Sequence, residues 1–479
     1  MYSLGDNVIR KMVGKRVNAQ SARRVLAVMV AAALLPGVIA VGAVSAATPK
    51  ANGTCAKVGQ TASAGSQKLV CTKVGSKNLW KASAATTLPP VTSAVPTTAA
   101  APTTAAATAG KKAADSSLAP VKIGLVNVDS GSPSFPDVNE GAKAAVKYMN
   151  AELGGVNGHP VELVVCSAGF DVQSNQKCGQ QFANDESIKL VITGLLFNPG
   201  SMYSALTASN TPVLGRIPLT APDFTNKNTY FYGSGTLSNN GLAYLLLDKF
   251  KYVHSVGFII SDTSAGRAGV VAMKGILTAG GVSNFKDSFV NEASPDVSGA
   301  ITALGKVDAI YVGLTAPTCL QLAQNAGIIP AGTVMVGPGS CITGDVFLKV
   351  KGAQENWTFV SGEVPIEAGK GVRPDLDTFL DKCPQYGCSA TPGRFVSPYW
   401  GHLLTTRAIL EGIGFDKLTK ATINSTLAAY KGSANMGVPS VSCPGNADYP
   451  TICATTLIPY VIKNGKPVVA YPGYTIDLR

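Results

Sequence analysis

From residue 121 onward, short apolar runs alternate with segments of helical period, and this alternation restricts the possible folds more than any other feature of the chain. The runs at 121–128, 161–165 and 188–193 are apolar enough and long enough to form buried strands. Amphipathic helices are expected between them, at residues 139–153 and 174–185. Because strands that alternate with helices pair in parallel, the pattern predicts an α/β fold with helices on both faces of parallel sheets.

The same alternation continues through the second half of the chain. Strands are expected at residues 256–260 and 308–312, and a helix at 267–279. The body that begins at residue 120 has about 360 residues, which is more than one hydrophobic core of this class usually holds. We therefore expect the body to divide into two lobes.

The formal net charge of +12 is confined to the N-terminal part of the chain. Residues 1–47 carry six Lys or Arg and one Asp, residues 48–120 carry eight Lys and one Asp, and the remainder carries 26 basic and 26 acidic residues. A neutral body is a poor surface for a nucleic-acid backbone, so nucleic-acid binding is not expected. The basic arm suits an anionic polymer of the cell envelope, although lysines that only improve solubility would give the same count.

Residues 1–47 have the features of an export signal. Six basic residues precede an apolar run at 25–44, and small residues at 45–47 offer a cleavage site. The run is nearly long enough to span a bilayer, so an uncleaved anchor is the alternative. We expect a secreted, extracytoplasmic protein that associates with the cell envelope.

All ten cysteines lie beyond this signal, and an even number in an oxidising compartment predicts disulfides. Cysteines that are neighbours along the chain are expected to pair. The five predicted disulfides are Cys55–Cys71, Cys166–Cys178, Cys319–Cys341, Cys383–Cys388 and Cys443–Cys453. No Cys-x-x-Cys motif occurs and the three histidines are scattered, so neither a metal nor another cofactor is expected.

The usual motifs of catalysis do not occur in the sequence. Gly-x-Ser-x-Gly, His-Glu-x-x-His and phosphate-binding loops are all missing. His159 and His254 precede predicted strands, and His402 lies in a predicted late helix, which are positions typical of structural histidines. We therefore expect a binding protein and not an enzyme.

Two segments separate the export signal from the body. Residues 48–82 combine short alternating patterns with glycines around Cys55 and Cys71, which predicts a small β module stapled by one disulfide. This segment resembles the short cysteine-paired modules of actinobacterial secreted proteins. Residues 83–119 are rich in Ala, Thr and Pro and lack large apolar side chains, so they are expected to form an extended linker.

Four segments of the body form an ordered set: the first strand at 121–126, the helix and its Gly-rich exit at 141–160, Asp296-Val-Ser before a later helix, and Pro398-Tyr-Trp-Gly in a late helix. By these segments, residues 120–479 resemble the type I periplasmic binding proteins, in particular the branch that binds leucine, isoleucine and valine for ABC importers. The resemblance implies two parallel-sheet lobes, joined by three crossing strands, that close on a ligand. Lobe I would comprise about 121–235 and 365–440, and lobe II about 236–364 and 441–479.

Two loops of lobe I are expected to hold the ligand. Asn198 is a good N-cap for a helix that starts at Pro199, and the free N–H groups near Ser201 would suit a carboxylate or carbonyl; an ordinary capped helix is the alternative. The second loop contains Leu219 and Thr220. The resemblance implies that the Thr220 hydroxyl binds the ligand carboxylate, with a turn hydroxyl as the alternative. The aromatic residues that would line the cleft are Phe135, Phe197, Tyr311 and Tyr399, and a place in the core is the alternative for each of them.

Lobe II departs from the amino-acid-binding members at the two positions that hold the ligand ammonium. Ala265 stands where these members have a tyrosine, and Ser294 stands where they have a glutamate. Glu292 would replace the missing carboxylate if its loop shifts. Because a buried ammonium needs a carboxylate or several acceptors, the departures favour an amide, a carboxylate or a mostly apolar solute over a zwitterionic amino acid.

Together these features predict a monomeric extracytoplasmic protein that captures a small amino-acid-like, amide or carboxylate solute in a cleft between its lobes. Its partner would be an ABC permease in the membrane. The alternative is an envelope-tethered sensor or scaffold protein that uses the same clamp without transport. The extra N-terminal module and the missing lipidation site favour that alternative more than usual.

Overall fold

The computed structural model describes residues 53–82, apart from 56, 59, 65 and 66, and residues 112–478, apart from 132–133, 343–346, 351–355 and 392–394. The chain divides into two compact units, Met1–Thr98 and Ala99–Arg479. The predicted export signal and residues 83–111 of the predicted linker lie outside the described residues. Among the residues that are described, no helix has both the length and the apolar character needed to cross a membrane.

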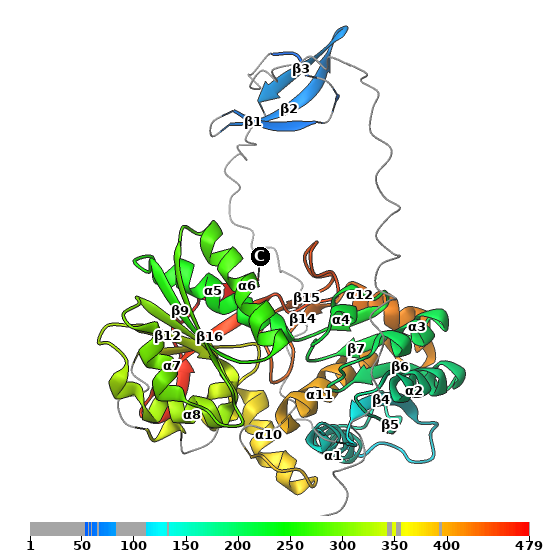
Figure 1. Cartoon of the computed structure of the whole chain (residues 1–479). Coiled ribbons are helices and arrows are strands. Elements are labelled where there is room, and N and C mark those ends of the chain that lie inside the picture. Colours follow the sequence, from blue (N-terminus) through cyan, green and yellow to red (C-terminus); the bar gives the residue numbers. More distant parts are fainter. Residues whose placement is uncertain are drawn as a thin grey trace, which may run out of the picture. The chain divides into compact units, whose positions relative to one another are not determined.

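The first unit contains a small antiparallel sheet (Figure 1). Its strands β1 (Thr61–Ala64), β2 (Gln67–Val74) and β3 (Lys77–Ala82) pair in the order β1-β2-β3. Leu69, Cys71 and Trp80 are buried together, and the disulfide from Cys71 to Cys55 ties the preceding loop to them. A core this small needs the covalent staple, as the sequence predicted.

Lobe I of the second unit is a five-stranded parallel sheet in the order β5-β4-β6-β7-β8. Its strands are β4 (Val121–Val128), β5 (Val161–Ala168), β6 (Ile188–Thr193), β7 (Val213–Gly215) and β8 (Thr229–Phe231). Alternate residues of β4 pack against different helices. One set contacts α1 (Pro136–Glu152) and α11 (Val396–Ile413), and the other contacts α2 (Val172–Asn184) and α3 (Gly200–Ala208). The sheet is therefore covered on both faces, as parallel sheets require.

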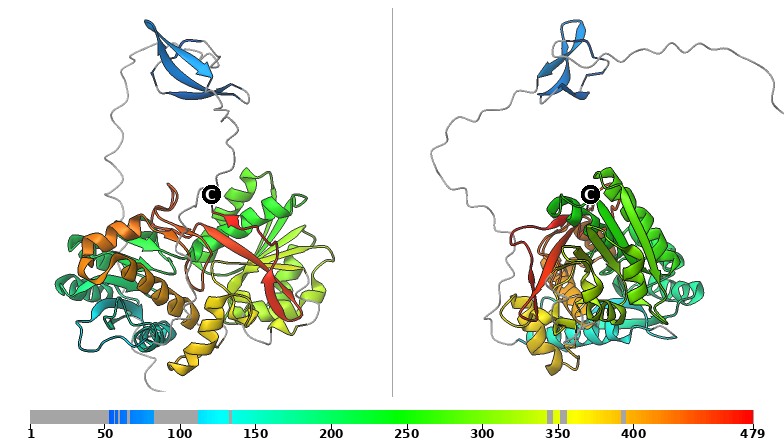
Figure 2. Two further views of the ribbon diagram at one scale, coloured as in Figure 1. Left: turned by 180° about the vertical axis from the view of Figure 1, so that it is seen from behind. Right: turned by 60° about the vertical axis from the view of Figure 1, so that its left-hand side comes forward.

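Lobe II is built on an eight-stranded sheet in the order β10-β9-β11-β12-β13-β16-β17, with β18 (Ile476–Asp477) also paired to β16. Five strands are parallel: β9 (Ser255–Ser261), β10 (Asn284–Val290), β11 (Ala309–Gly313), β12 (Val334–Pro338) and β13 (Trp357–Ser361). The antiparallel strands β16 (Thr456–Lys463) and β17 (Lys466–Val469) complete one edge, drawn in red in Figure 2. Helices α5 (Ser238–Lys249) and α6 (Ser264–Ala279) cover one face, and α7 (Val297–Leu304) and α8 (Ala316–Gln324) cover the other.

The chain passes between the two sheets three times. The first passage follows β8 and the second follows β13, before α10 (Pro374–Gln385). The third follows α12 (Lys420–Ala428) and runs through the short strands β14 (Lys431–Gly432) and β15 (Val441–Ser442) to β16. Backbone bridges join Phe231 to Ile452 and Glu363 to Gly437, so the passages lie beside one another. This arrangement confirms the two-lobed α/β fold.

Three helices begin earlier than the periodicity indicated, and local capping explains each case. Pro136 occupies the first turn of α1, where its missing N–H costs nothing. The side chain of Asp171 accepts a hydrogen bond from Ser174 N at the start of α2, and Thr263 accepts one from Gly266 N at the start of α6. Caps fix helix ends more sharply than the hydrophobic pattern does.

The end of the predicted linker belongs to the body, which corrects the boundary at residue 119. Lys112 N donates to Glu152 O at 3.1 Å, Ala114 N donates to Asn150 O at 2.7 Å, and Asp115 N donates to Gly158 O at 2.9 Å. These bonds are made by the backbone, so a polar, alanine-rich sequence gives no sign of them. The described residues 112–119 are therefore held along lobe I.

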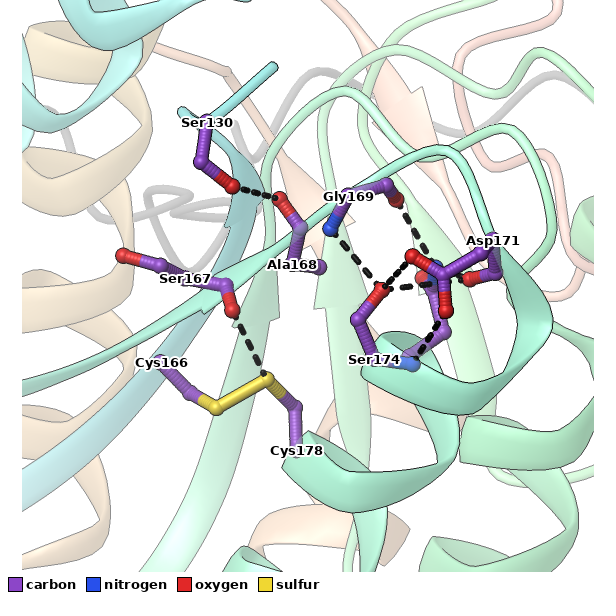
Figure 3. The surroundings of a disulfide bond; sticks show 9 residues. Ser130, Cys166, Ser167, Ala168, Gly169, Asp171, Ser174 and Cys178 are labelled. Carbon is purple, nitrogen blue, oxygen red and sulfur yellow. Dashed lines mark hydrogen bonds between the residues drawn. A yellow bond between two sulfur atoms is a disulfide. The ribbon is translucent and has the colours of Figure 1, made fainter.

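All five predicted disulfides form. Cys166 at the end of β5 is bonded to Cys178 in α2, and this bridge lies beside the turn where Ser174 binds Asp171 (Figure 3). The same view shows Ser130, which follows β4, donating to Ala168 O at 3.3 Å. The disulfide thus ties the end of β5 to α2, and the hydrogen bond of Ser130 joins the carboxyl ends of the neighbouring strands β4 and β5.

Candidate functional site

Ligands of open α/β sheets bind outside the carboxyl ends of the strands, and in lobe I this edge carries a group of apolar side chains. Three of them are fully buried and five are partly buried. We call this group the aromatic cluster; it consists of Val138, Leu195 and Tyr399 with Phe135, Phe197, Ile217, Leu219 and Phe395. Its members come from the segments after β4, β6 and β7 and from the start of α11.

The phenyl rings of this cluster pack against one another in ordered pairs. Phe135 stacks on Phe197 with ring centroids 6.0 Å apart and meets Phe395 edge to face at 5.8 Å. Phe197 also stacks on Phe170, which precedes α2, at 4.5 Å. Aromatic pairs prefer these geometries, and the partly exposed rings give the strand ends an apolar, aromatic character.

Some buried polar atoms at this edge have no hydrogen-bond partner among the described residues, for example Oγ1 of Thr193 at the end of β6. Two others are the hydroxyl of Tyr399 and Oδ1 of Asp129, whose Oδ2 accepts a hydrogen bond from Asn139. Burial raises the pKa of Tyr399, so its hydroxyl stays protonated and can donate. Because unsatisfied buried polar groups are costly, this donor and this acceptor are suited to groups on a bound solute.

The loop before α3 differs from its prediction. Asn198 does not cap the helix, because Pro199 occupies the N-cap position and the Asn198 side chain donates to Phe170 O instead. Ser201 Oγ donates to Val172 O at 3.2 Å. Both polar side chains therefore fasten this loop to the start of α2, which is a structural role. Phe197 is the residue of this loop that joins the aromatic cluster.

The second predicted loop is organised around one buried carboxylate. Asp223 Oδ2 accepts hydrogen bonds from Leu219 N at 2.8 Å, Thr220 N at 2.7 Å and Thr220 Oγ1 at 3.0 Å, while Oδ1 accepts one from Tyr203. The Thr220 hydroxyl is thus used in the turn before α4 (Ala221–Thr225), in agreement with the alternative interpretation. A cavity of ≈ 500 Å³ lies between α3 and α4 and shares no lining residue with the aromatic cluster.

In lobe II, Glu292 lies where the carboxyl ends of β9, β10 and β11 meet. Its carboxylate accepts hydrogen bonds from Thr315 N at 3.0 Å, from Thr318 Oγ1 at 2.8 Å, and from the hydroxyls of Ser261 and Thr315. These donors belong to lobe II and include the first turn of α8. Glu292 therefore links the end of β9 to the start of α8, and the hydrogen bonds from these donors occupy the acceptor positions of its carboxylate.

The remaining predicted site residues of lobe II do not form a group with it. Tyr311 is 2% exposed and packs against Phe258 with ring centroids 5.6 Å apart, in the core beneath α5 and α6. This placement corrects its prediction as a lining residue, because β11 directs its side chain into the core under α5 and α6 and away from the carboxyl ends of the strands. Ser294 is exposed in the loop before α7, and Ala265 is the second residue of α6.

An ion pair that the sequence analysis did not single out joins the lobes beside this site. Arg216 follows β7, is fully buried, and donates through Nε to Glu363 Oε1 at 2.9 Å and through Nη2 to Glu363 Oε2. Glu363 belongs to the second passage between the lobes. Gly437 of the third passage lies so close that a Cβ there would be 2.4 Å from Arg216 Nη2. The sequence offered one sign of this ion pair, because Arg216 is a charged residue directly after the apolar run at 213–215.

His402 lies near this ion pair and predicts a pH-dependent stability. Burial lowers its pKa from 6.5 to about 3, and Arg216 contributes further. Below pH 6.5 the unfolded chain binds a proton that the folded protein does not. The free energy of unfolding therefore decreases as the pH is lowered, until about pH 3. From pH 7 to pH 5 we expect this residue to remove about 2 kcal/mol of unfolding free energy.

Urea unfolding of the wild type and of His402→Gln at pH 7, 6 and 5 measures this effect. The glutamine variant should lose about 2 kcal/mol less over that range, whatever its stability at pH 7. An identical pH dependence for the two proteins would contradict the assignment of the proton to His402.

Comparison with known protein families identifies the family of this chain. The model of the periplasmic binding protein family matches residues 120–435. The chain belongs to this family. Its body is similar in fold to solved structures of transporter solute-binding proteins. Comparison with curated protein sequences finds no match.

Solved structures share the fold of this family member at low sequence identity. A protein from Rhodospirillum rubrum, described as a putative branched-chain amino acid ABC transporter, is 16% identical, covers 73% of this chain and 100% of its own, and has a TM-score of 0.59. A solute-binding protein from R. palustris in complex with 4-hydroxybenzoate is 16% identical over 75% and 98%, with a TM-score of 0.57. A substrate-binding protein from Streptococcus pneumoniae in complex with isoleucine is 17% identical over 75% and 99%, with a TM-score of 0.54.

Proposed function

We propose that this extracytoplasmic solute-binding protein captures a small carboxylate with a planar or branched apolar body, and delivers it as a monomer to an ABC permease. The observation that carries the proposal is the aromatic cluster with the unpartnered hydroxyl of its buried member Tyr399, together with the unpartnered Asp129 Oδ1 in the segment after β4. Stacked rings bind a flat apolar body, and the Tyr399 hydroxyl supplies a donor for a carboxylate oxygen. Asp129 Oδ1 would accept a hydrogen bond from a hydroxyl or amide on the same solute.

The state of Glu292 argues against a zwitterionic amino acid. An α-ammonium in a closed cleft needs a carboxylate with free acceptor positions. Glu292 already accepts hydrogen bonds from Ser261, Thr315 and Thr318. The structurally similar proteins include one in complex with isoleucine and one in complex with 4-hydroxybenzoate, so the fold accommodates both classes. The chemistry of this chain favours the second class.

Closure of the lobes would occur about the three passages, with lobe limits near residues 235, 364 and 440. A ligand stabilises the closed state only by contacts that the open state lacks. The alternative function, an envelope-tethered sensor or scaffold protein, uses the same closure without a permease. Its supporting observation is the folded N-terminal module, which solute capture does not require.

A thermal-shift panel tests the proposed solute class. Benzoate, 4-hydroxybenzoate and phenylacetate should each raise the melting temperature, while benzamide and leucine should have smaller effects. At a solute concentration one hundred times Kd the stabilisation is about 2.7 kcal/mol, which a melting curve resolves readily. A strong response to leucine with none to the aromatic acids would refute the proposal.

Tyr399→Phe separates binding from folding at the same site. Removal of a buried hydroxyl that has no partner among the described residues should leave stability unchanged or raise it by about 1 kcal/mol. Affinity for the carboxylate should fall about tenfold, because one hydrogen bond to a charged group is lost. Calorimetric titration and urea unfolding measure the two quantities. Reduced stability with unchanged affinity would show that the hydroxyl serves the fold.

A further inference from the structure

The N-terminal module is uniformly basic, and solute capture gives no reason for this. Residues 48–82 contain six lysines and no Asp or Glu. Four of these lysines have described side chains, and all four are exposed: Lys57, Lys73, Lys77 and Lys81. The body, in contrast, has equal numbers of basic and acidic residues from residue 121 onward. The attraction for anions is therefore concentrated in the module.

The two faces of the module's sheet differ. One face carries the buried residues Leu69, Cys71 and Trp80. By the strand register, Val70 pairs with Lys81, Thr72 with Leu79 and Val74 with Lys77, so these six residues share the opposite face. Val70, Thr72 and Leu79 are partly exposed there, and Val74 is 45% exposed. We call this the basic face; its centre is apolar and hydroxyl-bearing, and lysines stand at its ends.

The spacing of the lysines indicates an extended partner. Lys77 and Lys81 lie four residues apart on β3, which corresponds to about 13 Å at the usual rise of a strand. Side chains at that separation do not converge on one small anion. They match a linear polymer that carries charges at intervals along its length.

The same face is unsuited to nucleic acid. Binding of single strands uses exposed aromatic rings on which bases stack, and Trp80, the aromatic residue of the described module, is 5% exposed on the other face. The strip formed by Val70, Thr72 and Leu79 offers short apolar and hydroxyl groups, which suit the edge of a sugar ring. Since the family is extracytoplasmic, the polymers within reach are those of the cell envelope.

We propose that the basic face of the N-terminal module binds an extended anionic polysaccharide of the cell envelope. The module would thereby anchor the solute-binding body at the envelope without a lipid. This inference goes beyond solute capture and does not depend on which solute the body binds.

Biolayer interferometry of the exported protein on immobilised polygalacturonate tests the proposal. The neutral comparison polymer is the fully methyl-esterified form, which keeps the backbone and removes the charge. We expect at least tenfold weaker binding to the ester. The variant Lys77→Gln/Lys81→Gln should bind polygalacturonate about 25-fold more weakly, at roughly fivefold for each lysine near an anionic surface. Its binding should also depend less steeply on salt.

The matched control replaces two exposed lysines of lobe I, Lys143 and Lys147, by glutamine. This control has the same change in net charge and should retain its affinity within about twofold, because neither lysine belongs to the basic face. Equal losses in both variants, or equal binding to polymer and ester, would overturn the proposal. Tighter binding to single-stranded DNA of equal charge, or to anionic vesicles, would overturn it in favour of those partners. Loss of solute binding with polymer binding intact would refute only the proposed function.

Discussion

Replacement of Arg216 by leucine is expected to lower the free energy of unfolding by about 3–5 kcal/mol. The guanidinium is fully buried and forms two hydrogen bonds with Glu363, whose side chain is 26% exposed. Leucine keeps part of the volume but leaves the carboxylate without its partner. Burial raises the pKa of Glu363 and Arg216 lowers it, so loss of the arginine should let this carboxyl bind a proton more readily.

Urea unfolding measures the loss, and two further variants identify its cause. The double variant Arg216→Leu/Glu363→Leu should recover a large part of the stability, because no unpaired charge remains. Arg267→Leu is the matched control, since Arg267 forms an exposed pair with Asp262 at 2.7 Å and should cost less than about 1 kcal/mol. A loss of that small size for Arg216→Leu as well would show that the ion pair is not important for the fold.

Phe197→Ala is expected to weaken solute binding about thirtyfold. Of all substitutions in the aromatic cluster, we expect this one to have the largest effect on Kd. The ring stacks on both Phe135 and Phe170, so its removal takes away the centre of the apolar surface. Loss of a buried phenyl contact corresponds to about 2 kcal/mol, which is the stated change in Kd. Calorimetric titration with the solute that gives the strongest thermal shift measures it.

The control for this variant is Phe250→Ala. Phe250 ends α5 in lobe II, is also partly buried, and lies outside the aromatic cluster. Both variants should lose stability through their reduced packing, but the change at Phe250 should leave Kd within about twofold. If Phe250→Ala weakens binding as much as Phe197→Ala does, the cluster is not the binding surface.

The strands could be predicted from the sequence because their signal is local. β4 and β6 have the bounds that their apolar runs indicated, and the disulfides join cysteines that are neighbours in the sequence. Helix starts were less accurate, since a cap such as Asp171 or Thr263 depends on the geometry of one turn. The backbone contacts of residues 112–119 leave no trace in the side chains.

The site was harder to predict because its parts come from distant segments. Phe135 and Phe197 were recognised from the loops that contain them, but Phe395 joins them from a helix almost 200 residues later. Arg216 and Glu363 are 147 residues apart. Tyr311 was predicted to line the cleft but is buried in the core. The residues around a strand aromatic do not show which face of the sheet its side chain will occupy.

The disulfides bear on how the protein moves. Each one closes a short loop, with separations from 5 residues at Cys383–Cys388 to 22 at Cys319–Cys341, and together they use all ten cysteines. No covalent cross-link therefore ties one sheet of the body to the other. The Cys166–Cys178 and Cys383–Cys388 disulfides stiffen lobe I and Cys319–Cys341 stiffens lobe II, whereas Cys443–Cys453 closes a loop within the third passage between them. A reducing environment would therefore loosen each lobe separately and would also loosen one of the three connections about which the lobes move.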